Sequence, residues 1–220
     1  SELTAFTYTN TSTGTGDITV GAIGTASTTQ GAQSITSVNV STSADGASQV
    51  VLGALVGNDG SVTAADADDA ELTTYAVDLK GNYGSSTIGS IDVEAITTFD
   101  LDTAAAGTSL VLAAVNVDRN IGAITIDNAD NLTFTAGFTT GWTTGTVGDV
   151  TINSTGGGLD IEADADSFTG YLSVGNITIT TDGGSVDLGE INGVTTIGNI
   201  SITAKDDVEI DGAGDATTIG

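Results

Sequence analysis

The stretch VGNITITTDGGSVDLGEINGVTTIGNISI, residues 174–202, begins and ends with the same six-residue motif. In each copy an apolar residue and a glycine precede two apolar residues at alternate positions, Ile177 and Ile179 in the first copy and Ile200 and Ile202 in the second. Alternation of this kind is typical of a strand with one buried face. The stretch therefore predicts short strands that recur as a unit, here after 23 residues.

The same motif recurs from residue 88 onward. Successive copies start 33, 26, 27, 23 and 22 residues apart, at Ile88, Ile121, Val147, Val174, Ile197 and, truncated, Ile219. A second alternating motif starts 11 or 12 residues after each complete copy, at Phe99 (FDL), Leu132 (LTF), Leu159 (LDI), Val186 (VDL) and Val208 (VEI). A third strand is expected before each glycine. Unequal strands that recur as a unit are typical of a solenoid rather than of a hairpin sheet.

These spacings predict an all-β fold, a parallel β-helix (β-solenoid) with three strands per coil and about 22–33 residues per coil. Tight corners are expected at Gly89, Gly122, Gly148, Gly175 and Gly198. Stacked coils place equivalent residues about 4.8 Å apart. We therefore expect an asparagine ladder of Asn176 and Asn199 and a hydroxyl ladder of Thr151, Thr178 and Ser201.

The whole chain, residues 1–220, reads as a single solenoid domain, with irregular coils over 1–87 and regular coils over 88–220. ITSVNV from Ile35 matches the first motif with Thr in place of Gly, and ITVGAIG from Ile18 and VGNDGSVTA from Val56 read as two degenerate coils. LVLAAVNV, residues 110–117, reads as a strand inserted within the longest coil.

Charge restricts the partners. Twenty-nine acidic and three basic residues give a formal net charge of −26, which excludes nucleic acid and anionic membranes as ordinary partners and favours divalent cations. The chain has no Cys and no His, so a disulfide framework, a thiolate metal site and histidine acid–base chemistry are excluded. It also lacks an apolar run long enough to span a bilayer, so no membrane insertion is expected.

Clusters of aspartates at turn-like positions are the candidate metal sites, because closely spaced carboxylate oxygens in a loop suit Ca²⁺. The candidate ligands are Asp66, Asp68, Asp69, Asp127, Asp130, Asp164, Asp166, Asp206 and Asp207. None of the clusters matches an EF-hand loop or a calcium-binding nonapeptide. The alternative is that these carboxylates are solvated turn residues.

Three weaker patterns point to other chemistry. A catalytic carboxylate pair can be drawn from Asp160, Glu162 and Asp187, although their alternation with apolar residues favours a solvated strand face. The Thr-x-Thr pair at 178 and 180 with its Ser-x-Thr neighbour at 201 and 203 is similar to the hydroxyl arrays of ice-binding solenoids. Glycosylation sequons start at Asn10, Asn39, Asn131, Asn153, Asn176 and Asn199.

The IGxIxI coils, free of Cys and rich in Thr, Ala, Gly and Asp, resemble prokaryotic surface-layer proteins and the giant extracellular β-solenoid adhesins and filaments. The resemblance implies an extracellular, cell-surface structural protein, not an enzyme, that self-assembles into a filament or lattice. A carbohydrate-binding or carbohydrate-cleaving β-helix is the alternative, and an ice-binding solenoid is the third.

Assembly is expected to proceed by head-to-tail strand addition. SELTAFTYT, from Ser1, is an alternating stretch that can follow the C-terminal TTIG, with Leu3, Ala5 and Tyr8 only imperfectly in phase. The alternative is that the chain is a fragment of a longer solenoid. An uncovered solenoid end exposes unpaired backbone groups that favour such a contact.

Overall fold

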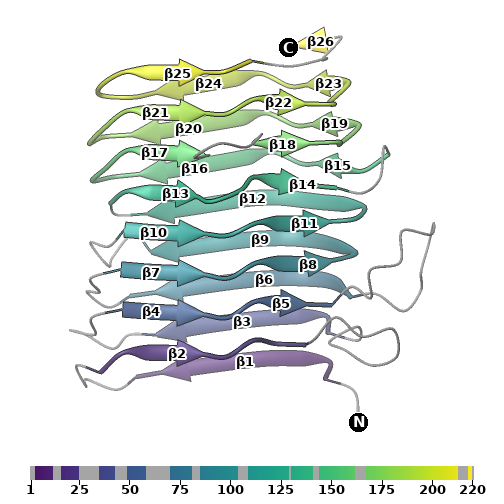
Figure 1. Ribbon diagram of the computed structural model, residues 1–220, viewed down its shortest axis with the longest axis vertical. Coiled ribbons are helices and arrows are strands. Elements are labelled where there is room, and N and C mark those ends of the chain that lie inside the picture. The colour runs from purple at the N-terminus through teal and green to yellow at the C-terminus, as the bar shows by residue number, and fades with distance from the viewer. Residues whose placement is uncertain are drawn as a thin grey trace.

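The computed structural model describes residues 3–11, 16–24, 35–42, 49–57, 70–80, 85–103, 109–128, 130–140, 144–161, 167–212 and 218–219. These residues form strands and no helix, and all the paired strands are parallel members of three sheets. Successive coils stack on one another from the N-terminal to the C-terminal end (Figure 1). The predicted fold class, a β-solenoid with three strands per coil, is confirmed.

Sheet A, the 12-stranded sheet, forms one side of the solenoid. It consists of β1 (Ala5–Asn10), β3 (Ser37–Thr42), β6 (Glu71–Leu79), β9 (Ala95–Thr103), β12 (Asn120–Asn128), β15 (Thr146–Val147), β16 (Val150–Ser154), β19 (Ser173–Val174), β20 (Ile177–Thr181), β23 (Thr196–Ile197), β24 (Ile200–Thr203) and β26 (Thr218–Ile219).

Sheets B and C lie side by side in front of sheet A in Figure 1. Sheet B consists of β2 (Ile18–Val20), β4 (Gln49–Leu52), β7 (Ser85–Ile88), β10 (Ser109–Leu112), β13 (Leu132–Phe134), β17 (Leu159–Ile161), β21 (Val186–Leu188) and β25 (Val208–Ile210). Sheet C consists of β5 (Leu55–Val56), β8 (Ile91–Val93), β11 (Val115–Val117), β14 (Phe138–Thr139), β18 (Phe168–Thr169) and β22 (Ile191–Asn192).

The core consists of columns in which apolar side chains of successive coils stack on one another. In sheet A, Ile124 lies between Phe99 of the preceding coil and Val150 of the following coil, and all three are buried. Aromatic rings join the sheets: the rings of Phe99 and Phe138 meet edge to face at 5.9 Å, and those of Phe138 and Phe168 stack at 5.2 Å. Sheet A therefore packs directly against sheet C.

Both predicted polar ladders are confirmed. Asn199 donates from its backbone N–H (3.1 Å) and from Nδ2 (3.3 Å) to Asn176 Oδ1. Thr151, Thr178 and Ser201 are partners on neighbouring strands of sheet A. Equivalent positions of successive coils therefore carry polar residues that can bond to one another along the solenoid axis.

The alignment of Ile88 with Ile121 is wrong. Ile88 lies in sheet B and pairs with Leu112, whereas Ile121 lies in sheet A and pairs with Val147. The pattern of apolar residue, glycine, any residue and apolar residue occurs at two different corners. One corner joins sheet B to sheet C, and the other bends the chain within sheet A.

Close approach between coils explains why both corners use glycine. A Cβ on Gly89, at the corner between sheets B and C, would lie 2.7 Å from the backbone nitrogen of Ala54 in the preceding coil. A Cβ on Gly122, at the corner within sheet A, would lie 1.9 Å from the carbonyl oxygen of Thr97. The same steric requirement at two places therefore produces the same motif.

The misalignment also affects the coil before Ile121. Phe99 pairs with Ile124, so FDL lies in sheet A and is not equivalent to LTF in sheet B. The segment 110–117, expected to be an insertion, forms β10 and β11, which pair with β13 and β14 as regular strands.

The N-terminal coils agree better with expectation. ITSVNV, residues 35–40, is equivalent to the first motif. The pairing of β3 with β6, of β6 with β9 and of β9 with β12 aligns Val38 with Ile124 of that motif. ITVGAIG, residues 18–24, provides β2 and a bridge from Ile23 to Leu55. Most of VGNDGSVTA lies outside the described residues.

We predict that Gly122→Ala destabilises the fold by about 1–3 kcal/mol, because the added methyl group overlaps the backbone of the preceding coil. Gly21→Ala is the control, since its Cβ would meet nothing within 4 Å and the substitution changes the unfolded chain in the same way. Urea unfolding of both variants measures the difference. Equal midpoints would show that the corner relaxes without strain.

Candidate functional site

The C-terminal end of the described coils exposes apolar side chains that point along the core columns. We call Ile200, Ile202, Val208 and Ile210 the C-terminal end face. Val208 and Ile210 are 47% and 45% exposed. Their partners one coil earlier in sheet B, Val186 and Leu188, are only 1% and 0% exposed. The difference arises because no further coil covers β25 within the described residues.

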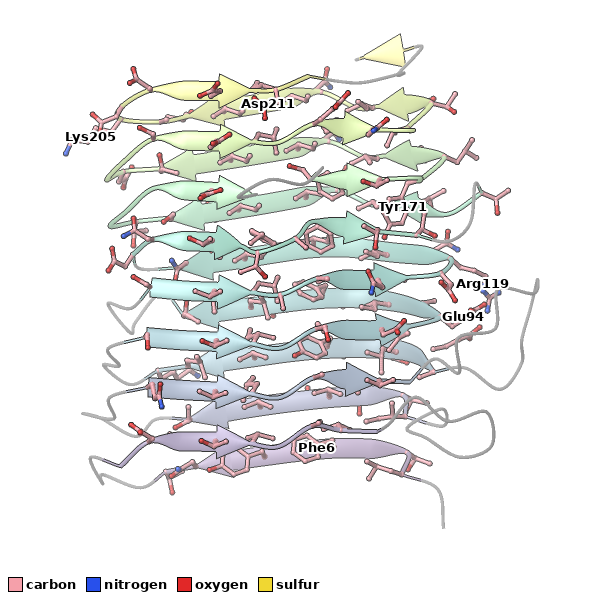
Figure 2. The ribbon with its side chains drawn as sticks, in the orientation of Figure 1. Phe6, Glu94, Arg119, Tyr171, Lys205 and Asp211 are labelled. Carbon is pink, nitrogen blue, oxygen red and sulfur yellow. The ribbon has the colours of Figure 1, made fainter. Side chains whose placement is uncertain are left out.

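The N-terminal end has the same character. Phe6 and Tyr8 of β1, with Val20 and Ile23, are partly buried and pack on the core from one side; we call these four residues the N-terminal end face. Figure 2 shows Phe6 in the first coil, directed between the sheets. The first and the last of the described coils therefore expose the same apolar core in cross-section.

The structure explains why Leu3, Ala5 and Tyr8 are imperfectly in phase. Ala5 is exposed, and Phe6 and Tyr8 occupy the inward positions, in register with Val38 and Val40. The reason is a corner after Leu3, equivalent to the one between Ile35 and Val38, which changes the alternation by one residue.

The end strands also have an uncovered edge. Among the described strands, β1 and β2 each pair with one neighbour, β3 and β4, and β24 and β25 pair only with β20 and β21. β26 extends sheet A over β23 but not over β24. Uncovered edges present N–H and C=O groups that can add another strand.

A ladder of carboxylates follows the outer face of sheet A. Asp78, Asp102 and Asp127 are partners on β6, β9 and β12, and Asp100 lies beside them. Lys80 Nζ lies 2.7 Å from Asp78, and Asn153 Nδ2 donates to Asp127 at 2.6 Å. Partial burial, and then the charges of Asp102, Asp127 and Asp78, raise the pKa of Asp100. The ladder is therefore a site of repulsion that cations or protons relieve.

A shallow groove of about 480 Å³ follows sheet B near its C-terminal end. Asp160 and Asp187 are neighbours on β17 and β21 and line it together with Asn131 and Thr133. Partial burial, and then Asp160 and the nearby Asp211 and Glu209, raise the pKa of Asp187. Glu162, the third carboxylate of the predicted catalytic set, lies outside the described residues.

The predicted metal ligands are distributed over separate places. Asp127 lies on the outer face of β12, Asp130 at the turn after that strand, and Asp206 and Asp207 at the turn before β25. In the described part of the chain, no three acidic side chains converge as metal ligands would. The remaining candidates, Asp66, Asp68, Asp69, Asp164 and Asp166, lie outside it.

A buried ion pair that the sequence motifs did not indicate connects three coils. Glu94, between β8 and β9, has a side chain only 3% exposed, and Arg119, between β11 and β12, is in contact with it. Arg119 also pairs with the exposed Glu71 of β6. Figure 2 shows Glu94 and Arg119 together at one corner of the solenoid. In the sequence, the available signal was the scarcity of basic residues, because it makes each basic residue a candidate partner for a buried acidic residue.

Four of the six sequon asparagines form hydrogen bonds between coils. Asn131 Oδ1 accepts from the N–H of Gly158 at 3.0 Å, and Asn153, Asn176 and Asn199 donate to the preceding coil. These amide groups therefore act in hydrogen bonds between coils.

Comparison with protein-family models, curated proteins and solved structures found no match to this chain. No helix suited to crossing a membrane occurs in the residues that the structure describes.

We predict that Arg119→Ala destabilises the fold by about 3 kcal/mol, because it leaves the buried Glu94 carboxylate without its guanidinium. Adding Glu94→Gln to this variant should recover part of the loss, since it removes the buried charge. Urea unfolding of the single and double variants measures both effects. If the double variant is no more stable than Arg119→Ala, packing of the arginine stem rather than charge explains the loss.

We predict that Asp100→Asn raises the melting temperature at pH 7. A carboxyl group whose pKa rises on folding from 3.8 binds its proton more tightly in the folded chain. The ionised group therefore destabilises the fold at neutral pH, and stability returns as the pH falls from above the raised folded pKa to below 3.8. Solvent screening limits the effect to about 1 kcal/mol or less.

Thermal scans between pH 7 and 4 should show a smaller gain on acidification for Asp100→Asn than for the unaltered chain. Asp182→Asn, at an exposed turn away from the ladder, is the control with the same change in charge. Equal stabilisation by both variants would attribute the effect to net charge rather than to the ladder.

Proposed function

We propose that this chain is a structural protein, a β-solenoid rod that associates with further copies of itself through its ends. The observation that supports this function is the exposure of Val208 and Ile210. From β4 onward, the equivalent side chains of the preceding coils are buried wherever burial is described, and all of them are apolar except Ser86 of β7. The end faces thus present surfaces that already form the contact between coils.

The estimated free energies of the contact between copies are consistent with reversible assembly. Covering Val208 and Ile210, each about half exposed, contributes about 1 kcal/mol per side chain. Each added strand hydrogen bond contributes about 0.5–1.5 kcal/mol. Loss of translational and rotational freedom, about 4–15 kcal/mol, and repulsion between bodies of charge −26 oppose them. Association should therefore strengthen with ionic strength.

An extracellular, cell-surface location and a non-enzymatic role belong to the same proposal and are supported by the composition and by its resemblance to surface-layer and adhesin coils. Calcium as a bridging cation stays a prediction from the sequence. The carboxylate ladder of sheet A supports this prediction only in that a cation would relieve the repulsion between its aspartates.

The alternatives are less well supported. The groove on sheet B contains Asp160 and Asp187, but no basic residue lines the part of it that the structure describes. Glu209 continues the same outward column, as expected of a solvated strand face. The hydroxyl array around Thr178 gives way to carboxylates at Asp100 and Asp127, so it does not extend along sheet A.

Ile210→Lys tests the role of the end face. The side chain is already 45% exposed, so the single copy should fold normally, but a charged group would be trapped in the contact between copies. Glu209→Gln is the matched control, because it makes the same change in net charge on the outer side of the same strand.

Sedimentation velocity at rising protein concentration, in salt up to about 0.5 M where charges are screened within a few ångströms, is the measurement. The unaltered chain and Glu209→Gln should form larger species, and Ile210→Lys should remain monomeric. The proposal fails if the unaltered chain stays monomeric throughout, or if Ile210→Lys assembles as well as the control.

A further inference from the structure

We propose that Asn131 is an N-glycosylation site of this chain and that a neutral sugar linked to its Nδ2 lies in the groove on sheet B. This inference rests on the cell-surface location in the proposed function, because asparagine-linked sugars belong to the surface loops of secreted chains. It concerns a covalent modification that association of the rods does not require.

The structure separates the sequons by the amide atom that each asparagine uses. The sugar is linked to Nδ2, and Oδ1 is unchanged. Asn153 and Asn176 donate from Nδ2 to the preceding coil, at 2.6 Å to Asp127 and at 3.0 Å to Asp149. Asn199 donates from Nδ2 to Asn176 in the same way. A sugar on any of these three nitrogens would crowd a hydrogen bond between coils.

Asn131 uses the other amide atom. Its Oδ1 accepts from the backbone N–H of Gly158 at 3.0 Å. A backbone N–H only donates, so the amide oxygen and not the nitrogen must face it. Nδ2 lies on the other branch of the planar amide, and a linkage there leaves the bond to Gly158 in place. Asn131 is also exposed, at the turn before β13.

The two remaining sequon asparagines lie in strands of sheet A. Asn39 is half-buried in β3 between Thr7 and Ala76 of the neighbouring strands. Asn10, at the end of β1, is also half-buried, and its Nδ2 donates to the hydroxyl of Tyr8 at 3.3 Å. Neither asparagine has the exposed turn position of Asn131.

The groove on sheet B provides room for a sugar next to Asn131. Its volume, about 480 Å³, falls within the range of about 300–1,000 Å³ that is usual for small-ligand sites. Gly158, Gly183 and Gly184 line it together with Asn131. Because glycines have no side chain, the coils that follow Asn131 leave this space open.

The groove walls suit a neutral, hydroxyl-rich group. Asp160, Asp187 and Thr133 line the groove, and sugar hydroxyls can donate to the carboxylates and bond to the threonine. Partial burial, and then Asp160, raise the pKa of Asp187, so a hydrogen-bond donor beside it is favoured. No basic residue lines the described part of the groove, so an acidic sugar would be repelled.

The transfer needs an activated donor, an oligosaccharide linked to a lipid through pyrophosphate. The bond between the anomeric carbon and the pyrophosphate oxygen breaks, and a bond between that carbon and Asn131 Nδ2 forms. The nitrogen loses one hydrogen as a proton, and the lipid pyrophosphate leaves with the electron pair. No oxidation or reduction occurs.

The buried position of Leu132 determines when the transfer takes place. This residue lies between Asn131 and Thr133 in the sequon, and it is fully buried in β13. A transferase therefore reaches the sequon before this coil folds. The fold then determines at which asparagines a sugar is compatible with the native structure.

Expression with a cleavable export signal, in a eukaryotic cell line whose secretory pathway supplies the donor and the transferase, tests the site. Mass spectrometry of glycopeptides from the secreted, folded protein measures the occupancy of each sequon. Asn131 should carry a sugar in most molecules, and Asn153 and Asn176 should carry one in few.

Two threonine variants provide a matched comparison. Thr133→Ala removes the sequon of Asn131 and keeps its amide, and Thr155→Ala does the same for Asn153. Thr133→Ala should lower the mass of the secreted protein by one glycan, and Thr155→Ala should not. Thermal scans check that both variants are folded.

Single cysteines test the site without a transferase, because the chain has no cysteine of its own. Asn131→Cys and Asn153→Cys are each treated with a glucosyl methanethiosulfonate. The thiolate attacks the sulfur that carries the sugar linker, a disulfide forms and methanesulfinate leaves. Labelling should leave the melting temperature of Asn131→Cys unchanged and lower that of Asn153→Cys by about 2–4 °C or more. Comparison of labelled with unlabelled protein removes the effect of the substitution itself.

The outcomes separate this inference from the proposed function. An unmodified Asn131 in the secreted, folded protein, or equal occupancy of Asn131 and Asn153, would overturn the site. If the chain is not secreted, the labelled cysteines decide, and an equal fall in melting temperature for both would overturn the site. Sedimentation of the unglycosylated chain decides the proposed association of copies independently of either result.

Discussion

Parallel pairing of each strand with its equivalent in the next coil is the constraint on which the rest of this structure depends. It places equivalent residues of successive coils on one another along the solenoid axis, so a residue type that suits one coil is repeated in a column. Apolar columns such as Phe99, Ile124 and Val150 give a dry core. The same rule brings Asp78, Asp102 and Asp127 together, although like charges repel. A chain with three basic residues has few means of compensating such a column.

Much of the fold follows from the sequence because the columns are visible as repeated motifs. Where coils have equal corners, as from Val147 to Ile197, spacing alone gives the correct register. Spacing gives the wrong register at Ile88, because close approach of the backbone requires glycine at two different corners and the two corners therefore have the same motif. The length of the following strand distinguishes them: three residues from Ile91 in sheet C, but five from Ile124 to Asn128 in sheet A.

The candidate sites were less predictable. Local aspartate clusters suggested metal ligands, but the carboxylates that meet come from different coils, as Asp160 and Asp187 do. The contact of Glu94 with Arg119 depends on the corner of one coil lying over the corner of the next, where loop lengths vary and no motif marks the alignment. The asparagine ladder was predictable because Asn176 and Asn199 hold the same place in adjacent motifs.

The end faces combine two consequences of this pairing, the apolar columns and the accumulated negative charge. In the described residues, no further coil covers the apolar columns and strand edges at Ile210 and Phe6. The charge that accumulates with every coil acts at long range and would oppose association of copies, whereas burial and hydrogen bonding act only at contact. If copies associate as proposed, screening of the charge changes this balance without altering the contact, and ionic strength then controls the association.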